Sequence, residues 1–175
     1  THLRSGAPGP VLLEVPVDVA AEEIPDQAFM YRAVAGKKSA GDPRDVADSV
    51  KALLAAKTPI IYASWAVLQA EAWAELQELA ELTGIPVMTS TDGKSSFPEN
   101  HPLALGPAGI TATGMAAHFM KKSDLVFGIG SSFSKTLMTA LIPAGKTMVL
   151  ATDDMRYLNS QHRLDHGVLG DAKLV

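Results

Sequence analysis

Residues 123–133 read Ser-Asp-Leu-Val-Phe-Gly-Ile-Gly-Ser-Ser-Phe, and this stretch decides the fold. Its apolar centre, 125–129, is short, rich in β-branched and aromatic residues, and closed by glycines, which is typical of a strand buried on both faces of a parallel sheet. Gly128 and Gly130 allow the backbone to turn sharply at the carboxyl end of this strand, where Ser131 could cap a following helix. Ligands of open α/β sheets usually bind in the crevice beyond such carboxyl ends.

The composition restricts the classes of function. The chain has 175 residues, of which 47% are hydrophobic and 19% charged, enough for one well-buried domain with some additional chain. A net charge of −4 with interspersed acids and bases offers no basic stripe, so nucleic acid is not an expected partner. The lack of cysteine excludes disulfides and thiolate metal sites and is compatible with a cytoplasmic location. No apolar run reaches the roughly 20 residues of a membrane helix, so we expect a soluble protein without a membrane partner.

The amino-terminal part differs from the rest of the chain. Residues 9–18 alternate apolar and mixed side chains, which predicts one edge strand. Residues 19–41 show no sustained period and are typical of a linker. Because the chain begins with Thr1 and the linker isolates this strand, we expect a piece of a longer protein. Residues 1–18 would then be the tail of a preceding domain, and residues 42–175 would form the main domain.

From residue 42 onward, helices and strands alternate. Asp42-Pro43 is a helix start, because Asp42 can accept amide hydrogens and Pro43 suits the first helical position. Strands are expected at 60–63, 85–89, 103–105, 125–129, 147–152 and 168–169, and helices from 43 to about 57, at 67–83 and at 111–122, with a further helical turn at 135–141. This alternation predicts an α/β fold with a parallel sheet covered on both faces.

Four stretches carry a resemblance, in the same order along the chain. They are residues 9–18, 97–103 with Gly106, 123–130 and 170–173. Together they resemble the central domain of thiamine-diphosphate-dependent enzymes of the acetolactate synthase, pyruvate oxidase and benzoylformate decarboxylase group. The first stretch resembles the end of that family's pyrimidine-binding domain. The resemblance implies a Rossmann-like three-layer sandwich whose six-stranded parallel sheet has the order 3-2-1-4-5-6, with helices on both faces.

The resemblance also implies a function. The parent protein would use thiamine diphosphate and magnesium to decarboxylate or carboligate 2-keto acids, as a lyase or transferase. In that family the cofactor lies between the pyrimidine-binding and pyrophosphate-binding domains, so we expect it outside this chain and expect this piece alone to be inactive. Gly170-Asp171-Ala172 has alanine where the family's Gly-Asp-Gly metal motif has glycine, which favours a simple turn. The expected role is a structural domain that packs against those two domains and supports a homo-oligomer.

The crevice beyond the central strands is the candidate cofactor site. FAD-binding relatives tend to have glycines after the first central strand, whereas this chain has Ser64-Trp65-Ala66, and we expect the indole to fill the crevice. Asp153 could hold a ribose hydroxyl. If FAD or ADP does bind, the residues assigned to it are Ser64, Trp65, Gly128, Gly130, Ser131 and Asp153. The favoured interpretation is a cleft closed by side chains.

Two alternatives stay open. The chain could be a stand-alone FAD- or ADP-binding Rossmann-like module, or a purely oligomerising domain. His162 and His166 have the i, i+4 spacing of a zinc pair on a helix, but the intervening residues and Gly167 favour a loop, so no metal site is expected.

Overall fold

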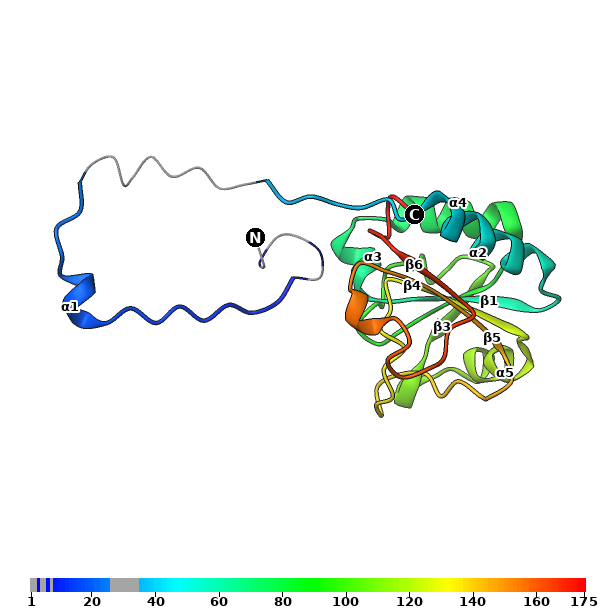
Figure 1. The fold of residues 1–175 in the computed structure, drawn as a ribbon. Helices are drawn as coiled ribbons and strands as arrows, with labels where there is room; N and C mark the ends of the chain where they lie inside the picture. Colours follow the sequence, from blue (N-terminus) through cyan, green and yellow to red (C-terminus); the bar gives the residue numbers. More distant parts are fainter. Residues whose placement is uncertain (1–2, 4–5, 7, 26–34) are drawn as a thin grey trace. The chain divides into compact units, whose positions relative to one another are not determined.

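The computed structural model, drawn in Figure 1, describes residues 3, 6, 8–25 and 35–175. The chain divides into two units, Thr1–Lys38 and Ser39–Val175. Among the described residues of the first unit, the regular element is the short helix α1, Val17–Ala20. Residues 8–16 form no strand, so the edge strand expected over 9–18 is wrong. A strand requires a partner for its backbone N–H and C=O groups, and the described residues of this unit supply none.

The second unit is built around a six-stranded sheet in the order β3-β2-β1-β4-β5-β6. All neighbouring strands are parallel, which confirms the predicted fold class and strand order. The two central strands pair along their whole length, with Pro59 opposite Leu125 and Ala63 opposite Ile129. The strands are β1 Pro59–Ala63, β2 Val87–Thr89, β3 Ala104–Pro107, β4 Leu125–Ile129, β5 Thr147–Thr152 and β6 His166–Leu169.

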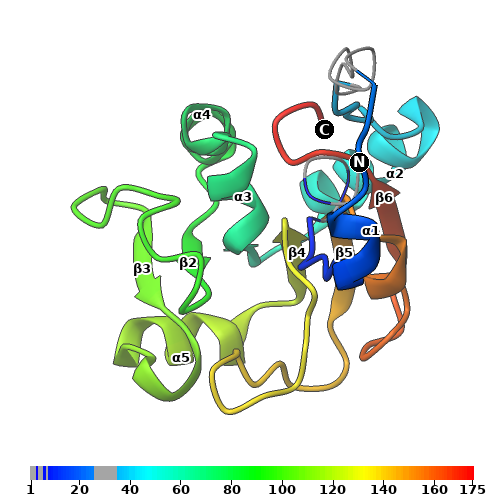
Figure 2. The ribbon, with the colours of Figure 1, turned by 90° about the vertical axis from the view of Figure 1, so that its left-hand side faces the viewer.

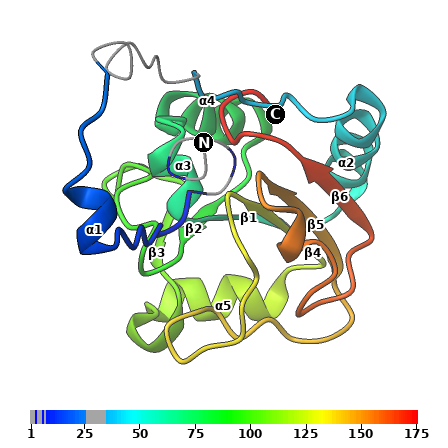
Figure 3. The ribbon, with the colours of Figure 1, turned by 60° about the vertical axis from the view of Figure 1, so that its left-hand side comes forward.

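Helices cover both faces of this sheet and complete the three layers (Figures 2 and 3). One face carries α2 (Pro43–Ala55), α3 (Trp65–Gln69) and α4 (Trp73–Thr83), and the other carries α5 (Gly114–Lys122). The side chains of β1 alternate accordingly. Ile61 packs in the core under α2 and α4, whereas Ile60 packs in the core under α5. Short 3₁₀ helices occupy Gly109–Thr111 (η2) and Met155–Tyr157 (η3).

Local capping explains where the longer helices begin. The Asp42 carboxylate accepts the Arg44 N–H at 2.8 Å, and Pro43 is the first residue of α2, as predicted. Thr113 plays the same part for α5, where its hydroxyl accepts the Ala116 N–H at 3.0 Å.

Three helix predictions are wrong. The single helix expected over 67–83 is divided into α3 and α4, because Glu71 has a left-handed backbone with φ 55° and Ala72 donates back to the Val67 carbonyl at 2.9 Å. No helix forms over 135–141, where a helical turn was expected. A single turn closes there instead, with the Thr139 N–H donating to the Thr136 carbonyl at 3.3 Å. Ser131 caps no helix, since its hydroxyl accepts the Phe133 N–H at 3.1 Å.

The predicted linker is only partly described, since residues 26–34 lie outside the described residues. At its carboxyl end, the Asp171 N–H donates to the Ser39 carbonyl at 2.8 Å. A Cβ placed on Gly41 would lie 2.7 Å from Val168 Cγ1, so residues 39–41 pack on the sheet. The predicted domain limits at residues 18 and 41 stay predictions. None of the helices in the described ranges combines the length and apolarity required to cross a membrane.

Candidate functional site

The six residues predicted to line a nucleotide cleft lie at the carboxyl ends of three adjacent strands. This edge contains the switch point of the fold, because the chain continues from β1 toward β2 on one side and from β4 toward β5 on the other. Ser64 and Trp65 follow β1, Gly128 lies within β4, Gly130 and Ser131 follow it, and Asp153 follows β5. The structure therefore brings them together along one edge of the sheet.

The backbone itself closes the switch point between β1 and β4. The Ser64 N–H donates to the Ile129 carbonyl at 3.1 Å, and the Ala66 N–H donates to the Gly130 carbonyl at 3.3 Å. Gly130 has φ 61°, and a Cβ at this position would lie 2.8 Å from Val67 N and 2.9 Å from Ala66 Cβ. Only glycine fits here without displacing the first turn of α3.

Trp65 does not act as the buried plug that the sequence suggested. Its side chain is 50% exposed at the first position of α3, so the expectation that the indole fills the crevice is wrong. The neighbouring Ser64 is instead covered by the loop after β2, since a Cβ placed on Gly93 would lie 2.6 Å from Ser64 Cα. Ser90 anchors this loop, because its N–H donates to the Ala63 carbonyl at 2.8 Å and its hydroxyl accepts the Gly93 N–H at 3.0 Å. The Asp92-Gly93 dipeptide is a turn signal that could have located this loop.

A buried aromatic cluster lies on the other face of the central strands. The Phe133 ring stacks on Tyr62 with centroids 6.2 Å apart, and His162 approaches it edge-on at 6.1 Å. A Cβ on Gly128 would lie 2.5 Å from Phe133 Cζ, so this glycine makes room for the ring. Burial raises the pKa of Tyr62 and lowers the pKa of His162. His162 is therefore a packed ring, and His166 begins β6 and does not share a helix with it.

The acids after β5 differ in their roles. Asp153, the predicted ribose ligand, is half-buried at the carboxyl end of β5. Asp154 is only 5% exposed and accepts hydrogen bonds from the Arg156 N–H at 2.9 Å and from Arg156 Nη2 at 2.6 Å. The Arg156 guanidinium holds the pKa of the Asp154 carboxyl below its usual value. Asp154 thus starts the helix η3, a role that the sequence analysis missed.

Asp171 belongs to a turn after β6. Its carboxylate accepts the Lys173 N–H at 3.1 Å, and the following Ala172 is buried. Within the part of the chain that the structure describes, no three His, Cys, Asp or Glu side chains cluster closely enough to hold a metal ion. Among the described residues, the contacts at the carboxyl edge of the sheet are backbone hydrogen bonds, aromatic packing and the hydrogen-bonded turns at Asp154 and Asp171.

Comparison with known proteins identifies the family. A family model described as "Thiamine pyrophosphate enzyme, central domain" matches residues 46–175. Glyoxylate carboligase of Escherichia coli O157:H7 is 34% identical over 174 residues, which cover 98% of this chain and 29% of that protein. The acetolactate synthase large subunit of Corynebacterium glutamicum is 33% identical over 184 residues, with coverages of 99% and 29%. The crystal structure of benzoylformate decarboxylase from Polynucleobacter necessarius has a TM-score of 0.71 at 26% identity, covering 91% of this chain and 30% of that one.

The chain spans less than a third of the length of these relatives. The matched residues, 46–175, include the whole six-stranded sheet and the switch point at its carboxyl edge. The match also agrees with the resemblance carried by the sequence motifs. The chain therefore belongs to the thiamine pyrophosphate enzyme family and contains the central domain of such an enzyme.

Proposed function

We propose that this chain is the central, non-catalytic part of a thiamine-diphosphate- and magnesium-dependent enzyme that decarboxylates or carboligates 2-keto acids, as a lyase or transferase. The observation that carries the proposal is the match of residues 46–175 to the central domain of thiamine pyrophosphate enzymes. The names of a carboligase, a synthase and a decarboxylase among its relatives point to this reaction class. In such an enzyme the bound cofactor would supply the chemistry at the keto carbon.

The described turn at 170–173, the stretch most similar to the family's metal motif, does not fit a metal-diphosphate site. The carboxylate of Asp171, in the stretch most similar to the family's metal motif, accepts the Lys173 N–H within its own turn. Ala172 places a buried methyl group where that motif has its second glycine. These contacts support binding of the cofactor outside this chain, between the pyrimidine-binding and pyrophosphate-binding domains of the same protein. We assign no step of the reaction to the residues of this chain.

Exposed apolar side chains support the proposed bracing role. In the first unit, Leu12 is 93% exposed and Leu13 82% exposed. We propose that residues 1–18 are the tail of the pyrimidine-binding domain, where other parts of that domain would cover these side chains, and that residues 19–41 are a linker. Trp65 and Trp73, each about half exposed on α3 and α4, would contact another domain or another subunit of a cytoplasmic homo-oligomer.

Calorimetry can test this division of labour. Thiamine diphosphate with magnesium is titrated into the 175-residue chain and, in parallel, into the protein encoded by the whole open reading frame. We expect no binding heat for the chain, and binding together with carbon dioxide release from 2-keto acids for the whole protein. Micromolar binding to the chain would refute the non-catalytic role. A whole protein that binds no thiamine diphosphate would refute the proposed class of enzyme.

Binding of FAD or ADP in the crevice near Ser64 and Gly130 stays the alternative to the closed cleft that we favour. The backbone at Gly93 and Val67 already approaches these two residues closely, which supports a closed crevice. A yellow purified protein, or a rise in melting temperature with ADP, would favour the nucleotide-binding module. A dimer on a sizing column with neither ligand would favour the oligomerising domain.

A further inference from the structure

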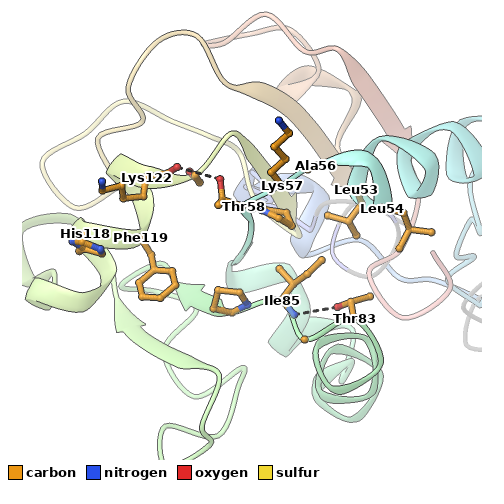
Figure 4. Close-up of a pocket in the computed structure, with 14 residues that line it drawn as sticks. Leu53, Leu54, Ala56, Lys57, Thr58, Thr83, Ile85, His118, Phe119 and Lys122 are labelled. Atoms are coloured by element: carbon orange, nitrogen blue, oxygen red, sulfur yellow. Dashed lines mark hydrogen bonds between the residues drawn. The ribbon is translucent and has the colours of Figure 1, made fainter.

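Two neighbouring pockets lie along α2, on the face of the sheet that also carries α4. The first, of about 90 Å³, is lined by Val46 and Val50 of α2, Leu79 of α4 and Phe127 of the sheet. The second, of about 390 Å³, lies at the carboxyl ends of both helices and is shown in Figure 4. Leu53 lines both pockets, so together they form one groove, which we call the α2–α4 groove. The proposed function uses none of these residues.

Both walls of the α2–α4 groove carry exposed apolar side chains. Val50 is 45% exposed, and Leu54, one helical turn further along α2, is 69% exposed. On α4, Leu82 follows Leu79 by three residues and so lies on the same side of the helix, where it is 78% exposed. Figure 4 shows Leu54 of α2 and Thr83 of α4 on opposite sides of the opening. Apolar stripes on two neighbouring helices are typical of a surface on which a third helix packs.

Ser49 indicates that the groove lacks an occupant. This buried residue lines the smaller pocket, and its hydroxyl has no hydrogen-bond partner within the described part of the chain. Buried hydroxyls are nearly always paired, so the free hydroxyl indicates a missing neighbour. Water alone is a poor occupant, because a buried water needs roughly two to four polar partners and every other side chain around this pocket is apolar.

Residues 171–175 have the hydrogen bonds of a helix start. The Asp171 carboxylate accepts the Lys173 N–H at 3.1 Å, and the Asp171 carbonyl accepts the Val175 N–H at 3.1 Å, which is the spacing of an α-helix with Asp171 as its N-cap. Lys173 ties this turn to α4, because its Nζ lies 3.3 Å from Glu75 Oε1. The turn lies between α2 and α4 (Figures 2 and 3), and Val175 lines the smaller pocket. A helix begun here would therefore enter the α2–α4 groove.

We propose that the segment that follows Val175 in the parent protein is an amphipathic helix that fills the α2–α4 groove. The inference rests on the proposed function, in which the parent protein also contains a pyrophosphate-binding domain. Val46 and Leu54 lie about 12 Å apart along α2, at about 1.5 Å per residue, so about eight further residues would cover the groove. Apolar residues should recur at the third or fourth and the seventh or eighth positions after Val175. The connection to the next domain would then begin as a packed helix instead of a flexible linker.

Thermal unfolding of two proteins can test the proposal. One is the 175-residue chain. The other is the same chain extended through its own reading frame by about 12 residues, enough to pass Leu54. The extension should raise the melting temperature by roughly 5–10 °C, as burial of two or three apolar side chains predicts, and should shift the amide NMR signals of Ser49, Val50 and Leu79. An unchanged melting temperature would overturn the proposal. Shifts of these amides with the concentration of the unextended chain would assign the groove to a second copy and would also overturn it.

Matched variants locate the added helix. Val50→Asp and Met115→Asp each replace an exposed apolar side chain of a helix, and both should be tolerated in the 175-residue chain. In the extended protein, Val50→Asp places a carboxylate beneath the helix and should remove most of the rise in melting temperature. Met115→Asp lies on α5, on the opposite face of the sheet, and should leave the rise unchanged. An equal effect of the two variants on the rise would overturn the proposal.

Calorimetry of the whole protein distinguishes this inference from the proposed function. A whole protein that binds thiamine diphosphate, together with an extension that leaves the stability unchanged, would refute the groove assignment alone. A whole protein that binds no thiamine diphosphate, together with a stabilising extension, would refute the class of enzyme and support the groove assignment. A reading frame that ends at Val175 would overturn both.

Discussion

Gly130→Ala tests whether backbone contact closes the switch point. Gly130 has a left-handed backbone, with φ 61°, directly after the central strand β4. A Cβ at this position would lie 2.8 Å from Val67 N and 2.9 Å from Ala66 Cβ. Val67 N is a backbone atom, and Ala66 Cβ is fixed by the backbone of α3, so no change of rotamer can relieve the overlap. The helix or the strand must shift.

Gly84→Ala is the matched control for the size of this effect. Gly84 also has a left-handed backbone, with φ 68°, but a Cβ there would meet open space. The control therefore carries only the left-handed penalty, about 1–2 kcal/mol. Gly130→Ala adds steric overlap, about 1–3 kcal/mol, so the free energy of unfolding should fall by roughly 2–5 kcal/mol. The overlap alone should lower the melting temperature by roughly 2–12 °C relative to the control, at about 2–4 °C for each kcal/mol.

Urea and thermal unfolding, followed by circular dichroism, measure both variants against the unmodified chain. Both should retain the helical and strand signals before unfolding. Equal losses of stability in Gly130→Ala and Gly84→Ala would refute the reasoning, because the close approach of α3 to Gly130 would then have no energetic consequence.

Two further substitutions test single side chains. Burial alone raises the pKa of Asp124, but the N–H donors of Lys57 and Thr58 lower it below its usual value. The unmodified chain should therefore keep this stabilisation above the ordinary aspartate pKa of about 3.9 and lose it as the pH falls through the lower folded-state pKa. Asp124→Asn should be less stable by about 1 kcal/mol at neutral pH. In a pH series of urea unfolding, the variant should not show the loss of stability at low pH that the unmodified chain shows. Ser49→Ala removes from α2 a buried hydroxyl that has no hydrogen-bond partner, so the free energy of unfolding should rise by about 0.5–1 kcal/mol. A loss of stability in the same assay would contradict the assignment of that hydroxyl as unsatisfied.

Local chemistry was sufficient to predict several elements of this fold. The strand β4 was predicted because an apolar stretch closed by glycines is typical of a strand covered on both faces, and both of its faces are covered. The start of α2 was predicted because Asp42 and Pro43 act on their own helix end. The cap of α2 is a contact between neighbouring residues, and the burial of β4 follows from the alternation of strands and helices, so both can be recognised in the sequence.

The division between α3 and α4 could not be predicted in this way. Ala70-Glu71-Ala72 contains neither glycine nor proline and has good helix formers, so propensity favours continuation. The break depends on the left-handed backbone of Glu71, on the Ala72 bond to Val67 O, and on Lys173 Nζ, which donates to the Glu71 carbonyl at 3.1 Å. Lys173 is distant in sequence, so a local pattern contains no information about this contact.

The same limit explains the candidate site. The sequence analysis assigned Trp65 and Gly130 to one crevice and expected the large indole to fill it. In the structure Ala66 and Val67, the next residues of α3, lie against Gly130, because a glycine beside a helix start allows the helix backbone itself to approach. The indole is therefore left half exposed. The strand expected over residues 9–18 is wrong for a related reason. Alternating apolar and polar side chains indicate that the two faces of a segment lie in different environments, but the pattern does not supply the partner strand that a sheet requires. Under the proposed function, the exposed apolar side chains of Trp65 and Leu12 would contact other domains or another subunit.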